Sequence, residues 1–120
     1  MNITLPFPPS LNRMYRISGS RMYVSREGLK YKKAVEKICS TLRIKPLDGL
    51  LSVSVDVYRP QRRGDLDNTF KCLFDSLNGF LWIDDKQIVE IHARRFDDKL
   101  KPRVEVEIRR HVGETSYSSL

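Results

Sequence analysis

The sequence is poor in cysteine and has no long hydrophobic run. Cys39 and Cys72 are the only cysteines among 120 residues, and neither lies in a CxxC motif or near a pair of histidines. This argues against a disulfide framework or a zinc site, and we expect two small buried side chains in a reducing compartment. The short apolar runs predict no membrane-spanning helix. Residues 1–9 lack the basic start and apolar stretch of a signal peptide, so we expect a cytoplasmic location.

The length and composition predict one globular domain. A chain of 120 residues can bury an ordinary hydrophobic core, and its residues are 40% hydrophobic and 31% charged. No repeat, low-complexity stretch or interior linker divides it. We therefore expect a single domain over residues 1–112, followed by a polar tail over residues 113–120.

Positive charge is concentrated in one third of the chain. Residues 11–45 contain ten lysines and arginines against two acidic residues, a surplus of eight positive charges in a chain whose net charge is +7. Such a one-sided field attracts polyanions such as nucleic acid. A solvated surface that merely keeps the protein in solution has the same composition, so charge alone leaves both readings open.

The hydrophobic pattern predicts a mixed sheet packed with two helices. Apolar and polar residues alternate over residues 51–58, which is typical of a strand with one buried face. After the N-cap residue Ser25, an apolar stripe from Tyr31 to Leu42 recurs at helical spacing. The expected elements are strands over 2–5, 21–24, 51–58, 87–96 and 103–110, helices over 26–42 and 67–77, and a proline-rich loop over 6–10. This order predicts a small α/β (α+β) domain with at least one antiparallel hairpin. The last two strands of the domain are joined through residues 97–99.

Two aspartates stand where a basic loop leads into the second predicted helix, in the sequence Asp65-Leu66-Asp67-Asn68. Capping and the helix dipole explain one acidic residue at a helix start, which leaves the second without a structural reason. Lys71 follows Asp67 by four residues, so the two share a helix face. Asp75 lies four residues further on, and an ordinary surface ladder of charges explains it.

A second acidic pair, Asp84-Asp85, directly follows the apolar residues 80–83. Turns favour aspartate, so one member of this pair is explained as a turn residue. Carboxylate oxygens from two separate segments are nevertheless the ligands that a hard cation such as Mg²⁺ requires. From these residues alone, a carboxylate metal site and a set of ordinary caps and turns both remain open.

Four short segments stand out when they are taken in order along the chain. They are Leu5-Pro6-Phe7-Pro8-Pro9-Ser10 followed by Asn12-Arg13, then Asp65-Leu66-Asp67-Asn68 with Lys71, then Asp75-Ser76-Leu77, and finally Gly79-Phe80-Leu81-Trp82-Ile83-Asp84-Asp85 followed by Gln87-Ile88-Val89. Together they make the sequence resemble the RusA family of Holliday-junction resolvases over residues 3–108.

The resemblance implies a crossover junction endodeoxyribonuclease that acts in DNA recombination and repair. It makes Asp65, Asp67 and Asp85 the catalytic, metal-binding carboxylates and Lys71 the catalytic lysine, and it leaves open whether Asp84 is also a ligand. It also implies Mg²⁺, with Mn²⁺ as a substitute, a homodimer, four-way junction DNA as the partner, and no small-molecule cofactor. Gly64 departs from the pattern, because relatives often carry a basic residue directly before the first aspartate, and one DNA contact is therefore in doubt.

Phosphodiester hydrolysis requires the residue types found here. A carboxylate-held metal activates water and stabilises charge on the phosphate, and Lys71 adds a positive charge beside it. The side chains expected to hold DNA are Asn12, Arg13, Arg62, Arg63 and Asn68.

Two other functions remain open from the sequence. A non-catalytic nucleic-acid-binding module explains the basic block, but not two acidic clusters that repel phosphate unless a cation lies between them. A general metal-dependent nuclease uses the same ligands. His92 and His111 pair with no nucleophile at a recognisable spacing. A twofold dimer would supply two symmetrical nicks, and residues 53–57 and 104–108 are the two candidate stretches for its interface.

Overall fold

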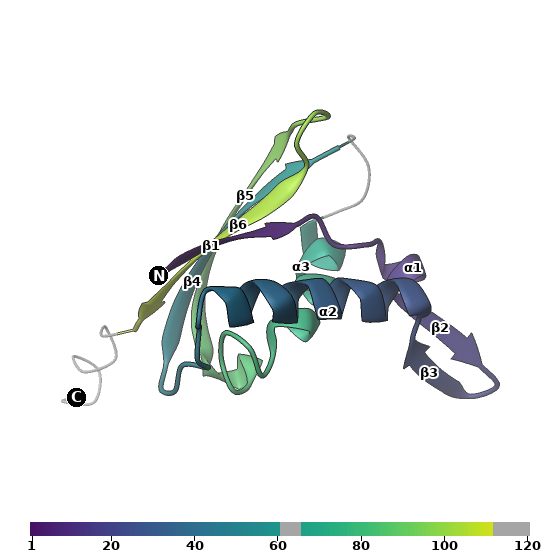
Figure 1. Cartoon of the computed structure of the whole chain (residues 1–120), viewed down its shortest axis with the longest axis horizontal. Coiled ribbons are helices and arrows are strands. Elements are labelled where there is room, and N and C mark those ends of the chain that lie inside the picture. The colour runs from purple at the N-terminus through teal and green to yellow at the C-terminus, as the bar shows by residue number, and fades with distance from the viewer. Residues whose placement is uncertain (61–65, 112–120) are drawn as a thin grey trace.

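A four-stranded mixed sheet with helices on one face forms the body of the protein (Figure 1). The computed structural model describes residues 1–60 and 66–111, and the side chains of residues 66–68 fall outside this description. The elements, in chain order, are β1 (Asn2–Pro6), α1 (Leu11–Met14), β2 (Tyr15–Ser18), β3 (Arg21–Val24), α2 (Arg26–Thr41), β4 (Leu51–Arg59), α3 (Leu66–Leu77), the 3-10 helix η1 (Asp85–Gln87), β5 (Ile88–Asp97) and β6 (Arg103–Arg110). The predicted mixed α/β architecture is confirmed, and α1 is a short helix that the sequence pattern did not predict.

The central strand β4 carries the core. The strand order is β1-β6-β4-β5, and β4 runs parallel to β5 and antiparallel to β6. Val55 lies opposite Ala93 on one side and Val106 on the other. The alternating apolar residues of β4 are fully buried, as the pattern predicts, and they are Leu51, Val53, Val55 and Val57.

The structure corrects two details of the strand analysis. β5 and β6 follow each other in the chain but do not pair, because β4 lies between them; the predicted antiparallel hairpin is instead formed by β2 and β3. The apolar residues of 53–57 and 104–108 are buried within the monomer. Neither stretch can therefore supply the apolar dimer interface for which it was a candidate.

Helix α2 packs along one face of the sheet (Figure 1). Ser25 caps it as predicted, with its Oγ accepting a hydrogen bond from the Gly28 amide at 3.0 Å. Tyr31 and Val35 are buried. Leu42 lies beyond the last turn and is 55% exposed, so the buried stripe ends earlier than expected.

Helix α3 buries Cys72, Leu73 and Leu77. It stops at Asn78, and Gly79 follows with φ of +86°, which is the predicted left-handed stop. Cys39 and Cys72 are both free and buried, as expected for small core side chains. In residues 1–60 and 66–111, no helix has the length and apolar character needed to cross a membrane.

Candidate active site

The pair Asp84-Asp85 lies in a tight turn that starts η1. Asp84 is the N-cap residue, because its Oδ1 accepts a hydrogen bond from the Lys86 amide at 2.9 Å. Gln87 completes the capping box, since its Oε1 accepts from the Asp84 amide at 2.9 Å. The hydrogen bond from the Lys86 amide lowers the pKa of Asp84. The turn thus accounts for Asp84 and leaves Asp85 as the functional candidate.

Contacts on both sides hold this turn in place. Gln87 Nε2 donates to the carbonyl oxygens of Leu47 at 2.9 Å and Gly49 at 2.8 Å. On the other side, the fully buried Trp82 donates through Nε1 to Asn78 Oδ1 at 2.6 Å. Because its neighbours are fixed to two other segments, the Asp85 carboxylate is presented from a rigid position.

Asp85 sits among other carboxylates. Its pKa is raised above the ordinary value for aspartic acid, first by burial, then by the hydrogen bond and charge of Asp84, and then by the charge of Asp75. A side-chain hydrogen bond with Asn78 opposes this shift. A carboxylate whose pKa is raised by neighbouring negative groups belongs to a site whose ionised state a cation would stabilise.

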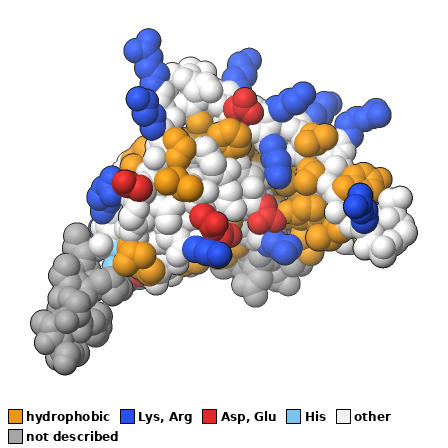
Figure 2. Space-filling view, turned by 90° about the horizontal axis from the view of Figure 1, so that it is seen from below, with side chains coloured by type: hydrophobic (Ala, Val, Ile, Leu, Met, Phe, Trp, Pro, Cys, Tyr) orange, Lys and Arg blue, Asp and Glu red, His pale blue; other side chains and the backbone are white. Residues whose placement is uncertain are grey.

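One face of α3 supplies the neighbouring polar groups. Asp67, Lys71 and Asp75 follow at intervals of four residues, so their positions lie along a single stripe of the helix. Lys71 is exposed and Asp75 is half-buried. Figure 2 shows acidic side chains near the middle of one face of the molecule, with lysine and arginine side chains around them.

Tyr15 connects this stripe to the start of the β2–β3 hairpin. Its hydroxyl donates a hydrogen bond to Asp75 Oδ2. Burial, and then the hydrogen bond and charge of Asp75, raise the pKa of Tyr15 well above its usual range. The phenol therefore stays protonated at neutral pH and keeps Asp75 oriented.

The structure describes part of the predicted catalytic set. Lys71 is exposed, and Asp85 reaches the surface although the residues around it remove part of its solvation. Asp67 lies in the first turn of α3, but its side chain is outside the described part, and Asp65 lies wholly outside it. Among the side chains that the structure describes, those of residues 1–60 and 69–111, no group of three or more His, Cys, Asp or Glu is arranged to hold a metal ion. The donor set expected from the sequence consists only of oxygen atoms, which fits a hard divalent cation.

The structure likewise describes only some of the predicted DNA-binding residues. Asn12 and Arg13 are exposed on α1, next to the hairpin. Asn68 lies in the first turn of α3 with its side chain undescribed, and Arg62 and Arg63 lie outside the described residues.

Sequence reasoning missed three residues of this site: Asp75, Asn78 and Tyr15. A signal for Asp75 was present, because it continues the four-residue spacing from Asp67 and Lys71. Asn78 was taken only as part of a helix stop. Tyr15 lies 60 positions from Asp75 along the chain, so no local pattern joins the two.

The sequence matches a known protein family over most of its length. Residues 6–109 match the model of a family described as endodeoxyribonuclease RusA. The chain is 37% identical over 111 residues to the crossover junction endodeoxyribonuclease RusA of Escherichia coli strain K12, covering 89% of this chain and 92% of that one. It is 38% identical over 114 residues to the protein of the same name from Enterobacteria phage 82, again covering 89% and 92%. A RusA from Escherichia coli O139:H28 is 40% identical over 93 residues, covering 74% of this chain and 77% of that one.

Proposed function

Because the chain belongs to the RusA family of endodeoxyribonucleases, we propose that it resolves four-way DNA junctions by paired, symmetrical nicks. The observation that carries the proposal is the position of Asp85. Its carboxylate extends from a rigid turn beside Asp84 and Asp75, and burial together with these negative neighbours raises its pKa. Such a group suits the binding of a divalent cation beside a phosphodiester.

Family membership indicates a divalent metal requirement. We propose Mg²⁺, with Mn²⁺ as a substitute, held by Asp65, Asp67 and Asp85, since carboxylate oxygens are the ligands that both ions accept. When bound, the cation supplies Lewis acidity, which polarises the phosphate and makes a water molecule easier to deprotonate.

The chain's own side chains account for the rest of the chemistry. Lys71 places a positive charge on the same helix face as Asp67, where it stabilises the charge that develops on the phosphate or the leaving oxygen. Asn78 orients Asp85 through its hydrogen bond, and Tyr15 orients Asp75. The proposed DNA contacts are Asn12, Arg13, Arg62, Arg63 and Asn68.

Two cuts per junction require two active sites. One chain offers one set of Asp65, Asp67 and Asp85, so we propose a homodimer whose twofold axis matches the approximate symmetry of a four-way junction. We propose a cytoplasmic location, because the relatives come from a bacterium and a bacteriophage, whose DNA is processed in the cytoplasm.

The test compares a labelled four-way junction with a linear duplex of the same arm sequence, each with Mg²⁺ or with a chelator. The proposal expects nicks at symmetry-related positions on two opposing strands of the junction, only with the metal, and a dimer by light scattering. Equal cutting of the duplex would identify a general nuclease instead. Metal-independent binding without any cutting would identify a binding module.

A further inference from the structure

The β2–β3 hairpin projects from the body of the protein beyond the N-terminal end of α2 (Figure 1). Its two strands form a separate two-stranded sheet that pairs with no strand of the main sheet. Large apolar side chains near its tip are exposed, with Ile17 at 77% and Met22 at 62%. An exposed apolar surface on a small projecting element indicates a contact with another molecule.

The two faces of the hairpin carry different chemistry. Side chains directly opposite each other on paired strands lie on the same face. One face is therefore apolar, since Ile17 pairs with Met22. On the other face Tyr23 pairs with Arg16, and Arg21 lies two residues before Tyr23. The exposed aromatic ring therefore has one arginine opposite it and another beside it on its own strand.

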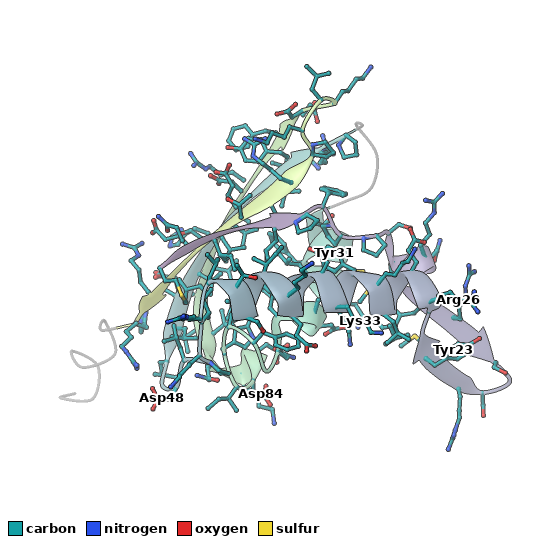
Figure 3. All side chains as sticks on the ribbon, viewed as in Figure 1. Tyr23, Arg26, Tyr31, Lys33, Asp48 and Asp84 are labelled. Atoms are coloured by element: carbon teal, nitrogen blue, oxygen red, sulfur yellow. The ribbon has the colours of Figure 1, made fainter. Side chains whose placement is uncertain are left out.

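The hairpin and the residues that flank it carry only positive charge. Residues 13–26 contain four arginines and no acidic residue. Arg13 approaches Glu27 at 4.0 Å, but no carboxylate among the described side chains of residues 1–60 and 69–111 lies within ion-pair distance of Arg16, Arg21 or Arg26. Figure 3 shows Tyr23 on the hairpin and Arg26 close by at the start of α2. An aromatic ring flanked by unpaired arginines is the combination that stacks on a base and holds the adjoining phosphates.

The hairpin is held firmly at its base. The Ser25 amide donates to the Met14 carbonyl at 2.8 Å, and the Ser25 hydroxyl donates to the Arg13 carbonyl. Gly28 allows this close approach, because a Cβ at that position would lie 2.6 Å from the Met14 oxygen and 2.7 Å from Val24 Cγ1. The ring of Tyr23 is therefore presented from a fixed base, and Tyr15 joins the same base to the acidic site through Asp75.

We infer that the hairpin recognises the branch point of the DNA junction. Tyr23 stacks on a base that is exposed where the strands cross, and Arg16 and Arg21 bind the adjoining phosphates. This inference rests on the proposed function and extends it. It assigns to the hairpin the preference for branched over linear DNA. The metal-binding carboxylates cannot supply this preference, because they contact the same phosphodiester group in branched and in linear DNA.

The test measures binding without cutting, in a chelator, so that it does not depend on the nuclease reaction. The probes are a four-way junction with 2-aminopurine at the branch point and the matching linear duplex. Tyr23→Ala is compared with Tyr23→Phe, which keeps the ring. The second control is Lys33→Ala, which removes an exposed lysine of α2, outside the hairpin. Because Tyr23 is 51% exposed, its removal costs little packing, and thermal melting checks that each variant is folded.

The expected result is selective. Tyr23→Ala weakens junction binding about 5- to 100-fold, the affinity that one stacked base provides, and abolishes the change in 2-aminopurine fluorescence. Tyr23→Phe behaves as wild type, and duplex binding is unchanged in both. Lys33→Ala keeps the fluorescence change.

Three results would overturn the inference: a folded Tyr23→Ala protein with wild-type junction affinity and fluorescence, a wild-type protein that binds both DNAs equally, or a change of oligomeric state in Tyr23→Ala. The third would make the hairpin a contact between two copies of the chain. A wild-type protein that binds junctions selectively but never cuts them would defeat the proposed function alone.

Discussion

The hairpin region and the acidic turn hold their charged groups in opposite ways. Arg16 and Arg21 stand exposed on a projecting hairpin, with no carboxylate partner in the described part of the chain. Asp84 and Asp85 are fixed by a capping box, a buried tryptophan and hydrogen bonds to distant carbonyls. Exposed cations suit binding to a DNA backbone, whose strength depends on salt. Preorganised polar groups suit catalysis, which requires charges already in position. The comparison therefore assigns affinity to one region and chemistry to the other.

Replacing Asp85 by asparagine should have the largest effect on cutting. The change removes a charge that is proposed to bind the cation and leaves the side-chain shape nearly unchanged. We expect the single-turnover rate to fall by about 10²–10³-fold or more, while junction affinity stays the same or rises because local repulsion is lost. Gel shift and nicking assays on one preparation measure both quantities.

The adjacent Asp84→Asn variant is the matched control. Asparagine is as good an N-cap as aspartate, so the turn should keep its form and most of its activity. Equal loss of cutting in both variants would show that the division between a capping and a functional aspartate is wrong.

Lys71→Ala should affect the rate almost as strongly. Lys71 is exposed, so the protein should melt at the wild-type temperature. Loss of a positive charge at the transition state costs about 10²–10³ in rate. The Lys33→Ala variant, which removes an exposed lysine from α2, should cut at the wild-type rate under saturating DNA. Wild-type turnover in Lys71→Ala would make Lys71 an ordinary surface residue.

Replacing Asp75 should shift the pH dependence of cutting, and this shift is a sharper test than the maximum rate. Because the pKa of Asp85 is raised, activity at limiting metal should fall on acidification at a pH above the ordinary aspartate pKa. Asp75→Asn removes one of the like charges that raise this pKa, so the acid limb should move to lower pH. An unchanged limb, or one moved to higher pH, contradicts this account of Asp85.

The same shift has a consequence for stability. A carboxyl group whose folded-state pKa is raised stabilises the fold most below its unfolded pKa, and this contribution is lost as pH rises through the folded value. In a chelator, Asp85→Asn should therefore lose less stability than wild type as the pH rises across this range.

Tyr15→Phe should give the smallest effect. It removes the hydrogen bond to Asp75, which is a contact to a charged acceptor and is worth about 1.5–3 kcal/mol of stability. We expect a lower melting temperature and only a several-fold loss of cutting, because Asp75 keeps its charge and loses only the contact that orients it. Tyr58→Phe, which keeps an aromatic ring on β4, is the control. A rate loss as large as that of Asp85→Asn would place Tyr15 in the chemistry itself.

The sequence predicted those parts of the fold that depend on local patterns. Alternation identified β4, and the Ser25 cap and the glycine after Asn78 marked the ends of helices correctly. Strand order was not predictable, because the insertion of β4 between β5 and β6 is decided by long-range packing. The dimer candidates failed for the same reason, since alternation shows that one face is buried but not what buries it.

For the site, the motifs located the acidic clusters but could not rank their members. Whether Asp84 or Asp85 caps the turn depends on which carboxylate meets the Lys86 amide, and only coordinates show this. The role of Asp75 depends on Tyr15, which the fold brings close from a distant segment. The aromatic ring beside two arginines was hidden because only residues 21–24 of the hairpin were predicted as a strand, so the pairing of Tyr23 with Arg16 was not visible in the sequence.

The most direct test of the division between affinity and chemistry is one paired measurement on Asp85→Asn and Arg21→Ala. Junction affinity and the single-turnover cutting rate at saturating DNA are determined in the same buffer with Mg²⁺. The account predicts that Asp85→Asn loses rate and keeps affinity, whereas Arg21→Ala loses affinity and keeps the saturated rate. If both folded variants lose the same quantity, the two regions do not have separate tasks and the account is contradicted.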